Sequence, residues 1–277
     1  WHQLPALDTR PIIVLFHGLA GSIRSPYAFR MMAALDRNGF NSVVMHFRGC
    51  FREPNRLARA YHSGETEDAK AFLAHLVKQY PGRKIGAVGY SLGGNMLLKL
   101  QGELGEASPL FAAVSVSAPI RLEQTADFMN RGLSRFYQKL LVDDLKKSLL
   151  QKFGQHDYAK LIGLEKEDVY RIKSFWEYDD LFTGPIHGFR NAAEYYAKSS
   201  AYDYIFKTAK ETLIIHALDD PFMPPSVLPR QSALPPEVFM EVSRHGGHVG
   251  FVGGSIVRPS FWLEKRIPEF LGNCLLD

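Results

Sequence analysis

The chain has 277 residues, of which 46% are hydrophobic and 22% charged, enough for the large core of one α/β domain with an insertion. Its net charge of +4 comes without a Lys/Arg-rich block interleaved with aromatics, so no nucleic-acid partner is expected. Its two cysteines, Cys50 and Cys274, suggest neither a disulfide framework nor a metal cluster and favour a reducing, cytoplasmic setting. No apolar run approaches the ~20 residues of a membrane span, so no transmembrane segment is expected.

Strand-like and helix-like segments alternate over the first 117 residues. Residues 11–17 form a continuous apolar run bounded by a proline and a glycine, typical of a central parallel strand. Further strands are predicted at residues 41–46, 84–90 and 111–117, and helices at 25–39, 64–80 and 92–102. This order requires right-handed crossovers and predicts an α/β fold with a mostly parallel central sheet flanked by helices.

From residue 120 to 210 the chain is rich in helix formers and aromatics and has no convincing strand. The alternation resumes with strands at 211–217 and 238–242 and a last amphipathic helix that begins at Phe261. We therefore predict a core built from residues 1–119 and 211–277 and a helical cap or lid insertion over 120–210. The alternative, that this segment is part of the outer helical layer, stays open.

The stretch Gly89-Tyr90-Ser91-Leu92-Gly93-Gly94 lies between a predicted buried strand and a predicted helix. A sharp strand-to-helix turn crowds the backbone, so the positions two before and two after its central residue must lack side chains. Gly89 and Gly93 meet that need. We therefore predict that Ser91 presents its hydroxyl above the sheet as a nucleophile.

A serine nucleophile needs a base, and the base needs an orienting acid. Asp219 and Asp220 follow the strand at 211–217, and His245 and His248 follow the strand at 238–242, each at a C-terminal strand end where ligands bind in such sheets. We favour Asp220 as the acid, with Asp219 capping the loop, and His248 as the base, with His245 bonding within its loop. A His-x-x-His metal site is the weaker interpretation of this pair, because a third ligand is missing nearby.

The tetrahedral intermediate of such a reaction needs two hydrogen-bond donors for its oxyanion. The backbone N–H groups of Leu92, directly after the nucleophile, and Leu19, in the glycine-containing loop after the first strand, are predicted to supply them. His17 is expected to pack within that loop. His46, His62 and His216 are expected to satisfy local hydrogen bonds, and Cys50 to be a small buried hydrophobe.

Several motifs together are similar to those of the α/β-hydrolase superfamily, and more narrowly of its YheT-like esterase branch (AB hydrolase 4 family), related to the eukaryotic ABHD1/ABHD3 hydrolases. They are Met45-His-Phe-Arg-Gly-Cys50, Glu53-Pro-Asn-Arg56, Tyr61-His-Ser-Gly-Glu-Thr-Glu-Asp68, Gly89-Tyr-Ser-Leu-Gly-Gly-Asn-Met96, Asp219-Asp-Pro-Phe-Met223 and His245-Gly-Gly-His-Val-Gly-Phe251. The resemblance implies the α/β-hydrolase fold and a Ser/Asp/His relay on Ser91, Asp220 and His248. The family's usual Ser-Gly pair after Cys50 is replaced by Phe51-Arg52, which is expected to narrow the mouth of the site. The family's N-terminal strands are expected to be absent, since this chain begins at Trp1.

We therefore expect a serine hydrolase that cleaves carboxylic esters of short to medium acyl chains through an acyl-enzyme, without a metal or organic cofactor. Its expected partner is a small-molecule or lipid-like ester, and no oligomeric state is predicted. Two alternatives remain: acyl transfer or thioester hydrolysis on the same triad, and a non-catalytic binding protein of the same fold. Six aromatics of the insertion offer an apolar lid or simply join it to the core; they are Phe128, Phe136, Tyr137, Phe153, Phe175 and Trp176.

Overall fold

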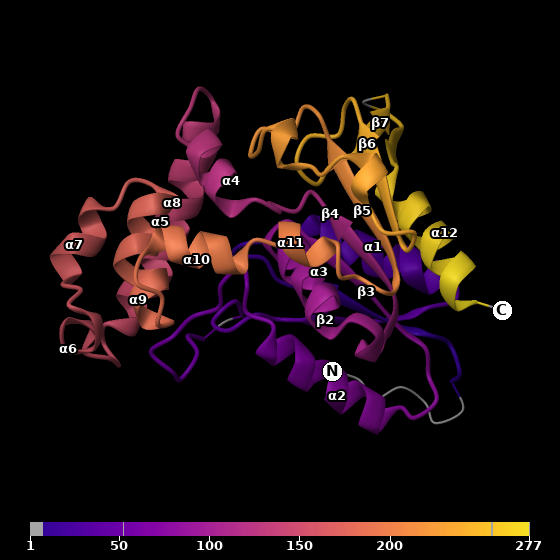
Figure 1. The fold of residues 1–277 in the computed structure, drawn as a ribbon, viewed down its shortest axis with the longest axis horizontal. Helices are drawn as coiled ribbons and strands as arrows, with labels where there is room; N and C mark the ends of the chain where they lie inside the picture. Colours follow the sequence, from indigo (N-terminus) through magenta and orange to yellow (C-terminus); the bar gives the residue numbers. More distant parts are fainter. Residues whose placement is uncertain (1–7, 52, 256, 277) are drawn as a thin grey trace.

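A six-stranded parallel sheet forms the centre of the molecule in the computed structural model, which describes residues 8–51, 53–255 and 257–276 (Figure 1). Its strand order is β2-β1-β3-β4-β5-β6, and all five neighbouring pairs are parallel. The predicted α/β fold is confirmed, and every predicted strand is present. The strands are β1 (Ile12–Phe16), β2 (Asn41–Met45), β3 (Ile85–Tyr90), β4 (Leu110–Val116), β5 (Glu211–Ala217) and β6 (Val238–Ser243).

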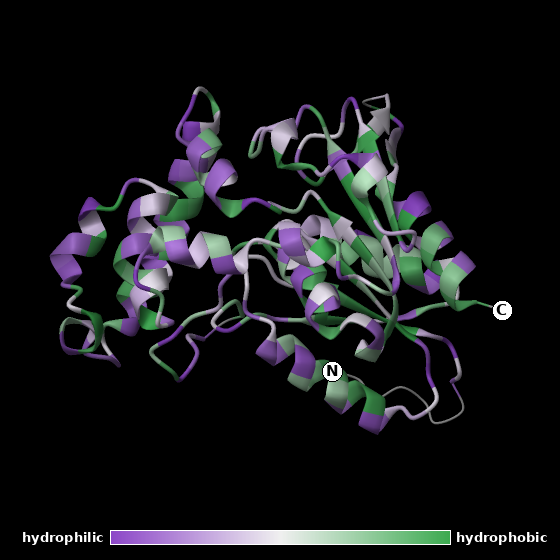
Figure 2. Cartoon of the chain, viewed as in Figure 1, coloured by the Kyte–Doolittle hydropathy of each residue, from purple (hydrophilic) through white to green (hydrophobic). Residues whose placement is uncertain are grey.

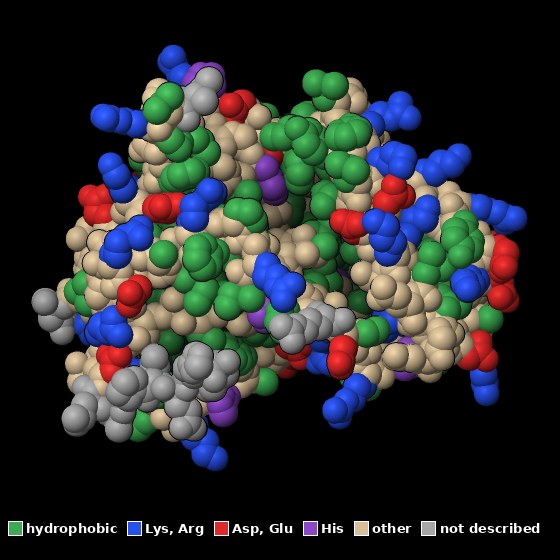
Figure 3. Space-filling view, turned by 180° about the vertical axis from the view of Figure 1, so that it is seen from behind, with side chains coloured by type: hydrophobic (Ala, Val, Ile, Leu, Met, Phe, Trp, Pro, Cys, Tyr) green, Lys and Arg blue, Asp and Glu red, His purple; other side chains and the backbone are tan. Residues whose placement is uncertain are grey.

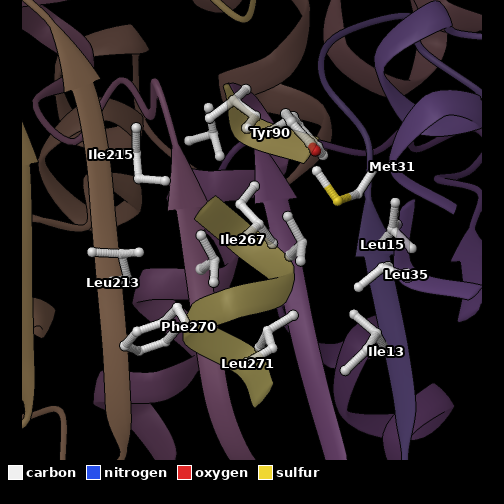
Figure 4. Packing of buried hydrophobic residues seen from close by; sticks show 14 of the residues in the cluster. Ile13, Leu15, Met31, Leu35, Tyr90, Leu213, Ile215, Ile267, Phe270 and Leu271 are labelled. Atoms are coloured by element: carbon white, nitrogen blue, oxygen red, sulfur yellow. The ribbon is translucent and has the colours of Figure 1, made fainter. Parts of the chain in front are cut away.

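Helices cover both faces of this sheet. Helices α1 (Pro26–Arg37) and α12 (Leu263–Leu275) pack on one face, and α2 (Glu67–Gln79) and α3 (Leu92–Leu104) on the other. On the first face, Ile267 and Leu271 of α12 lie against Ile13 and Ile215 of the sheet (Figure 4). The strands are mainly hydrophobic, as burial on both faces requires (Figure 2).

Two predicted helix starts were wrong, and one short hairpin was not predicted. Helix α2 begins at Glu67 rather than at residue 64, because the Glu65 carboxylate accepts the Glu67 N–H before the helix starts. Helix α12 begins at Leu263, since Phe261 is the last residue of a short hairpin that was not predicted. That hairpin pairs β7 (Val252–Gly254) with β8 (Pro259–Phe261). Strands of three residues containing glycine and proline are too short for hydrophobic periodicity to reveal.

The chain between β4 and β5 is helical, and the structure describes no strand there. Most of these helices lie beside the sheet domain and have an apolar core of their own, which includes Val142, Tyr158 and Phe182 (Figure 1). The last of these helices packs against α3 of the sheet domain. A Cβ on Gly102 of α3 would lie 2.1 Å from the carbonyl oxygen of Tyr204 in this last helix. The helices are α4 (Leu122–Met129), α5 (Ser134–Lys152), α6 (Tyr158–Ile162), α7 (Lys166–Arg171), α8 (Phe175–Tyr178), the π-helical turn Asp179–Thr183, α9 (Gly184–Ile186), α10 (Ala192–Ser199) and α11 (Tyr202–Ile205).

In the part of the chain that the structure describes, no helix combines the length and apolar character that crossing a bilayer requires.

Candidate active site

Ser91 lies on a sharp turn between β3 and α3. Its φ of 52° and ψ of −118° are unusual for a residue with a side chain, and its N–H donates to the Val116 carbonyl at 2.8 Å. A Cβ on Gly93 would lie 2.5 Å from the carbonyl oxygens of Phe16 and His17, and one on Gly89 would lie 2.4 Å from the Gly93 oxygen. The two glycines thus permit the close approach that holds Ser91 at the end of β3.

The loops after β5 and β6 bring Asp220 and His248 to this serine. His248 Nε2 lies 2.8 Å from Ser91 Oγ, and His248 Nδ1 lies 2.8 Å from Asp220 Oδ2. The carboxylate can only accept, so Nδ1 donates to it and Nε2 is left to accept the serine proton. The Asp220 side chain is fully buried, and its other oxygen accepts the Phe222 N–H at 2.8 Å. The Phe222 ring stacks on the imidazole, with ring centroids 4.1 Å apart, and so helps to fix its orientation.

Asp219, the neighbouring candidate, has a different task. Its Oδ1 accepts the N–H groups of Gly246 and Gly247, each at 2.9 Å, and so joins the two loops. These backbone donors, led by Gly247, lower the pKa of the Asp219 carboxyl. The exposed His245 ring lies 3.4 Å from the same carboxylate and does not line the cavity at Ser91. The geometry therefore favours Asp220 as the partner of His248 and a loop cap for Asp219.

The loop after β1 is held by two tyrosine hydroxyls. Tyr27 Oη accepts the Gly18 N–H and Tyr61 Oη accepts the Ala20 N–H, both at 2.8 Å. Within the described ranges, the N–H of Leu19 between them has no hydrogen-bond partner, and neither has that of Leu92. Both residues line the cavity at Ser91. Two donors are thus available beside the serine, where an oxyanion would need them.

A cavity of about 510 Å³ opens at Ser91 and extends beneath the helical segment. Its walls come from the loops after β1, β2 and β3 on one side and from α4, α5, α8 and α10 on the other. In the space-filling view the molecule is hollowed between its two parts, with hydrophobic side chains around the hollow (Figure 3). Its apolar lining includes Met129, Leu141, Leu145, Leu149, Phe175, Phe182 and Phe222.

The six aromatic residues of the insertion were expected either to line an apolar lid or to join the insertion to the core, and they divide between these roles. Of the six, Phe175 lines the cavity, whereas Trp176 packs on Tyr196 and donates to Asp127. Phe153 packs on Tyr158 within the helical segment, and Phe136 is largely exposed. Phe51 stands beside His46, with ring centroids 4.7 Å apart, and is not part of the cavity wall. Arg52, predicted to narrow the mouth with it, lies outside the described residues.

Comparison with known proteins shows to which family this chain belongs. A family model for the alpha/beta hydrolase fold matches residues 11–255. The chain belongs to the α/β-hydrolase fold family. It is also 47% identical over 277 residues to the Escherichia coli (strain K12) protein named "Putative esterase YheT", a match that covers 99% of this chain and 81% of that protein. The resemblance to the YheT-like branch is therefore confirmed.

Two further proteins are more distant. Phospholipase ABHD3 of Mus musculus is 28% identical over 265 residues, and the match covers 95% of this chain but 64% of that longer protein. The structure of the Pyrococcus furiosus esterase Pf2001 superimposes with a TM-score of 0.58 at 18% identity, over 96% of this chain and 84% of that one. At this identity the structural likeness shows the α/β-hydrolase fold alone.

The histidine rings and the Cys50 thiol near the active site were expected to have local structural roles. His17 Nδ1 donates to the Gly18 carbonyl at 2.7 Å and Nε2 accepts the Phe47 N–H at 3.1 Å, while burial lowers the pKa of the ring to about 4. His46 Nε2 accepts the Ile23 N–H, and His62 Nδ1 the Gly64 N–H, as expected. The expectation for His216 was wrong, because its buried Nε2 has no hydrogen-bond partner among the described residues. Burial raises the pKa of the Cys50 thiol to about 11, so it is not a ready nucleophile.

Sequence reasoning did not single out three residues that support this site. Tyr27 and Tyr61 hold the loop of Leu19, as described above. Asn95 of α3 is fully buried; its amide donates to the carbonyls of Ser63 and Ser199, and its oxygen accepts the Ala201 N–H. Tyr61 and Asn95 lie within motifs that carry the family resemblance, which was the available signal, whereas Tyr27 had none.

We expect Tyr61→Phe to leave the Ala20 N–H without its hydrogen-bond acceptor. The cost should be about 0.5–1.5 kcal/mol in the free energy of unfolding, with a fall in kcat larger than any rise in KM because the loop bearing Leu19 loosens. Urea unfolding and ester kinetics measure both effects. Tyr170→Phe is the matched control, since Tyr170 is exposed on α7. Equal behaviour of the two variants would show that the Tyr61 hydroxyl does not support the loop.

Proposed function

We propose that this carboxylic-ester hydrolase uses Ser91 as its nucleophile, His248 as its general base and acid, and Asp220 as the group that orients His248. The observation that carries the proposal is the hydrogen-bonded series Ser91 Oγ, His248 Nε2, His248 Nδ1 and Asp220 Oδ2, with both distances at 2.8 Å. The esterase name of the Escherichia coli relative supports the same reaction class. A non-catalytic binding protein, left open by the sequence, is not supported.

In the first half-reaction, Ser91 Oγ attacks the ester carbonyl while His248 Nε2 takes its proton. The oxyanion of the tetrahedral intermediate accepts hydrogen bonds from the N–H groups of Leu92 and Leu19. His248 then protonates the departing alkoxide, and the alcohol leaves an acyl group on Ser91. In the second half-reaction His248 takes a proton from water, the hydroxide attacks the acyl carbon, and the carboxylic acid leaves as Ser91 regains its proton.

The cavity supports esters with short to medium acyl chains as substrates. Its volume of about 510 Å³ lies within the range of ordinary small-molecule sites, and its walls beneath the helical segment are mainly aliphatic and aromatic. We propose that residues 120–210 act as a lid over this cavity. Acyl transfer or thioester hydrolysis would use the same acyl-enzyme and differ only in the acceptor or leaving group, so product analysis with competing alcohols separates these reactions.

Labelling with a fluorophosphonate tests the nucleophile. Because the probe reacts with activated serines, the protein should be labelled rapidly, and Ser91→Ala should not be labelled. Circular dichroism of both proteins checks that the substitution leaves the fold intact. Equal labelling of the two proteins, or labelling of neither, would contradict the proposed role of Ser91.

Replacement of the two neighbouring aspartates should separate their roles. Asp220→Asn is expected to lower kcat by about 10⁴, since an amide can stabilise neither the required tautomer nor the imidazolium. Asp219→Asn should instead cost stability, because it weakens the contacts to Gly246 and Gly247. Steady-state kinetics and urea unfolding of both variants give the comparison. A larger loss of kcat in the Asp219 variant would reverse the assignment.

A further inference from the structure

Lys152, the last residue of α5, is a buried cation. It is 5% exposed, and its Nζ donates to Asn55 Oδ1 at 2.9 Å and to the Arg59 carbonyl at 3.0 Å, both neutral oxygens. Within the described ranges no carboxylate forms an ion pair with it. Burial, and after it the positive charge of Arg48, lowers the pKa of Lys152 to about 8, so the ammonium is still the main form at neutral pH. A buried ammonium without a counter-ion is costly, and one of its three N–H donors remains available.

The same residue lines the cavity that opens at Ser91. Three leucines of α5, Leu141, Leu145 and Leu149, share the cavity wall with it. Their spacings of four, four and three residues place all four side chains on one helix face. Leu141 and Lys152 are about 16 Å apart along the helix axis, since each residue adds 1.5 Å. The wall is thus apolar along most of α5 and cationic at its C-terminal end.

The other end of α5 is attached to the catalytic loop. Ser134 Oγ donates to the Pro221 carbonyl at 2.6 Å, next to Asp220. One turn further on, the Tyr137 ring contacts Phe222, the residue that stacks on His248. Helix α5 therefore runs from the loop that carries Asp220 and Phe222 to the loop that carries Asn55. A molecule lying along its leucines would have one end near Ser91 and the other near Lys152.

A second cation borders the cavity near Lys152. Arg48 pairs with Asp68 through Nη2, while its Nε is buried and has no hydrogen-bond partner in the part of the chain that the structure describes. Two carboxyls, Glu53 and Asp179, also line the cavity. Asp179 accepts the Tyr196 hydroxyl at 2.8 Å, and burial raises its pKa to about 6. Neither carboxyl lies within ion-pair distance of Lys152, so the ammonium has no anionic partner among residues 8–51, 53–255 and 257–276.

We propose that the preferred substrate carries an anionic oxygen group, a carboxylate or a phosphate, at the end remote from its ester, and that Lys152 binds this group. The inference rests on the proposed function, because it places the ester carbonyl at Ser91. A plain structural role for Lys152, in which it only ties α5 to the loop of Asn55, predicts no dependence on substrate charge. Lys146 offers a matched control on the same helix: its Nζ donates to the carbonyls of Tyr170 and Ile172, and it does not line the cavity.

The kinetic test uses p-nitrophenyl half-esters of linear dicarboxylic acids, over a series of chain lengths, and the corresponding neutral methyl esters. At the chain length that reaches Lys152, the wild-type enzyme should have a higher kcat/KM for the half-ester than for the methyl ester. We define the ratio as kcat/KM for the half-ester divided by kcat/KM for the methyl ester. Lys152→Met should lower this ratio by about tenfold to a hundredfold, mainly through KM of the half-ester, as expected for loss of a bond to a charged group. Lys146→Met should leave the ratio unchanged. Lys152→Arg, which keeps the charge, should retain part of the preference.

The inference is overturned if the wild-type enzyme never prefers the half-ester, or if Lys152→Met slows both substrates by the same factor. Turnover of the neutral esters and its loss in Ser91→Ala test the proposed function separately. Calorimetric titration of Ser91→Ala with alkyl carboxylates, alkyl phosphates and alcohols of equal length needs neither turnover nor a Lys152 variant. Tighter binding of one anion class supports the inference and identifies that class, whereas equal binding of anions and alcohols contradicts it.

Discussion

Replacement of Ser91 by alanine should lower kcat for ester hydrolysis by roughly 10⁶, with little change in KM or in the free energy of unfolding. The effect is large because the Oγ that attacks the carbonyl is lost, and His248 is then left without a nucleophile to activate. The residual rate should come from the Leu92 and Leu19 donors and from substrate binding. Stopped-flow and long-time ester assays on highly purified protein measure the ratio.

Ser226→Ala is the control for this substitution, because Ser226 is exposed and its Oγ donates to Gln124 Oε1 at the surface. It should retain wild-type kcat. A Ser91→Ala variant that keeps more than a few per cent of the activity would show that another group starts the reaction, and the proposed mechanism would then be wrong.

Replacement of Gly93 by alanine should destabilise the protein by about 3 kcal/mol or prevent folding. The added methyl group would lie 2.5 Å from the carbonyl oxygens of Phe16 and His17, and backbone atoms cannot move aside as a flexible side chain can. Any shift would also separate α3 from β1 and so move Ser91 away from the loop of Leu19. Urea unfolding followed by circular dichroism gives the free-energy change.

The control for Gly93→Ala is Gly272→Ala, which also changes a glycine within a helix. A Cβ on Gly272 of α12 would meet only the end of the Leu276 side chain at 3.9 Å, so Gly272→Ala should be neutral or stabilise the fold by up to about 1 kcal/mol. If Gly93→Ala were as stable as Gly272→Ala, the close approach of α3 and β1 would not be the reason for a glycine at residue 93.

The sequence predicted the sheet well because most of its strands are apolar and bounded by turn residues, and because β1 to β4 are each followed by a helical pattern. The same regularity predicted where Ser91, Asp220 and His248 lie, since the ends of parallel strands meet at one edge. Choosing between Asp219 and Asp220 depended on local turn geometry, and the structure shows the contacts that separate them. The short β7–β8 hairpin lacked periodicity, and the start of α2 was decided by the contact of Glu65.

Other parts of the site depend on contacts between distant residues, which a single sequence does not display. Tyr27 and Tyr61 stabilise the β1 loop from 9 and 41 positions away. Lys152 reaches Asn55 across 97 positions, and in the sequence it is one of many lysines in a helical segment. Its burial, which motivates the inference about anionic substrates, follows only from the folding of α5 over the cavity.

The proposed mechanism requires an acyl group on Ser91, and this group can be trapped. The enzyme is mixed with a p-nitrophenyl ester, quenched in acid within the first turnover, digested and analysed by mass spectrometry. We expect a burst of about one p-nitrophenol per enzyme and an acyl adduct on the peptide that contains Ser91. An adduct on another residue, or a full burst in Ser91→Ala, would contradict the proposed mechanism.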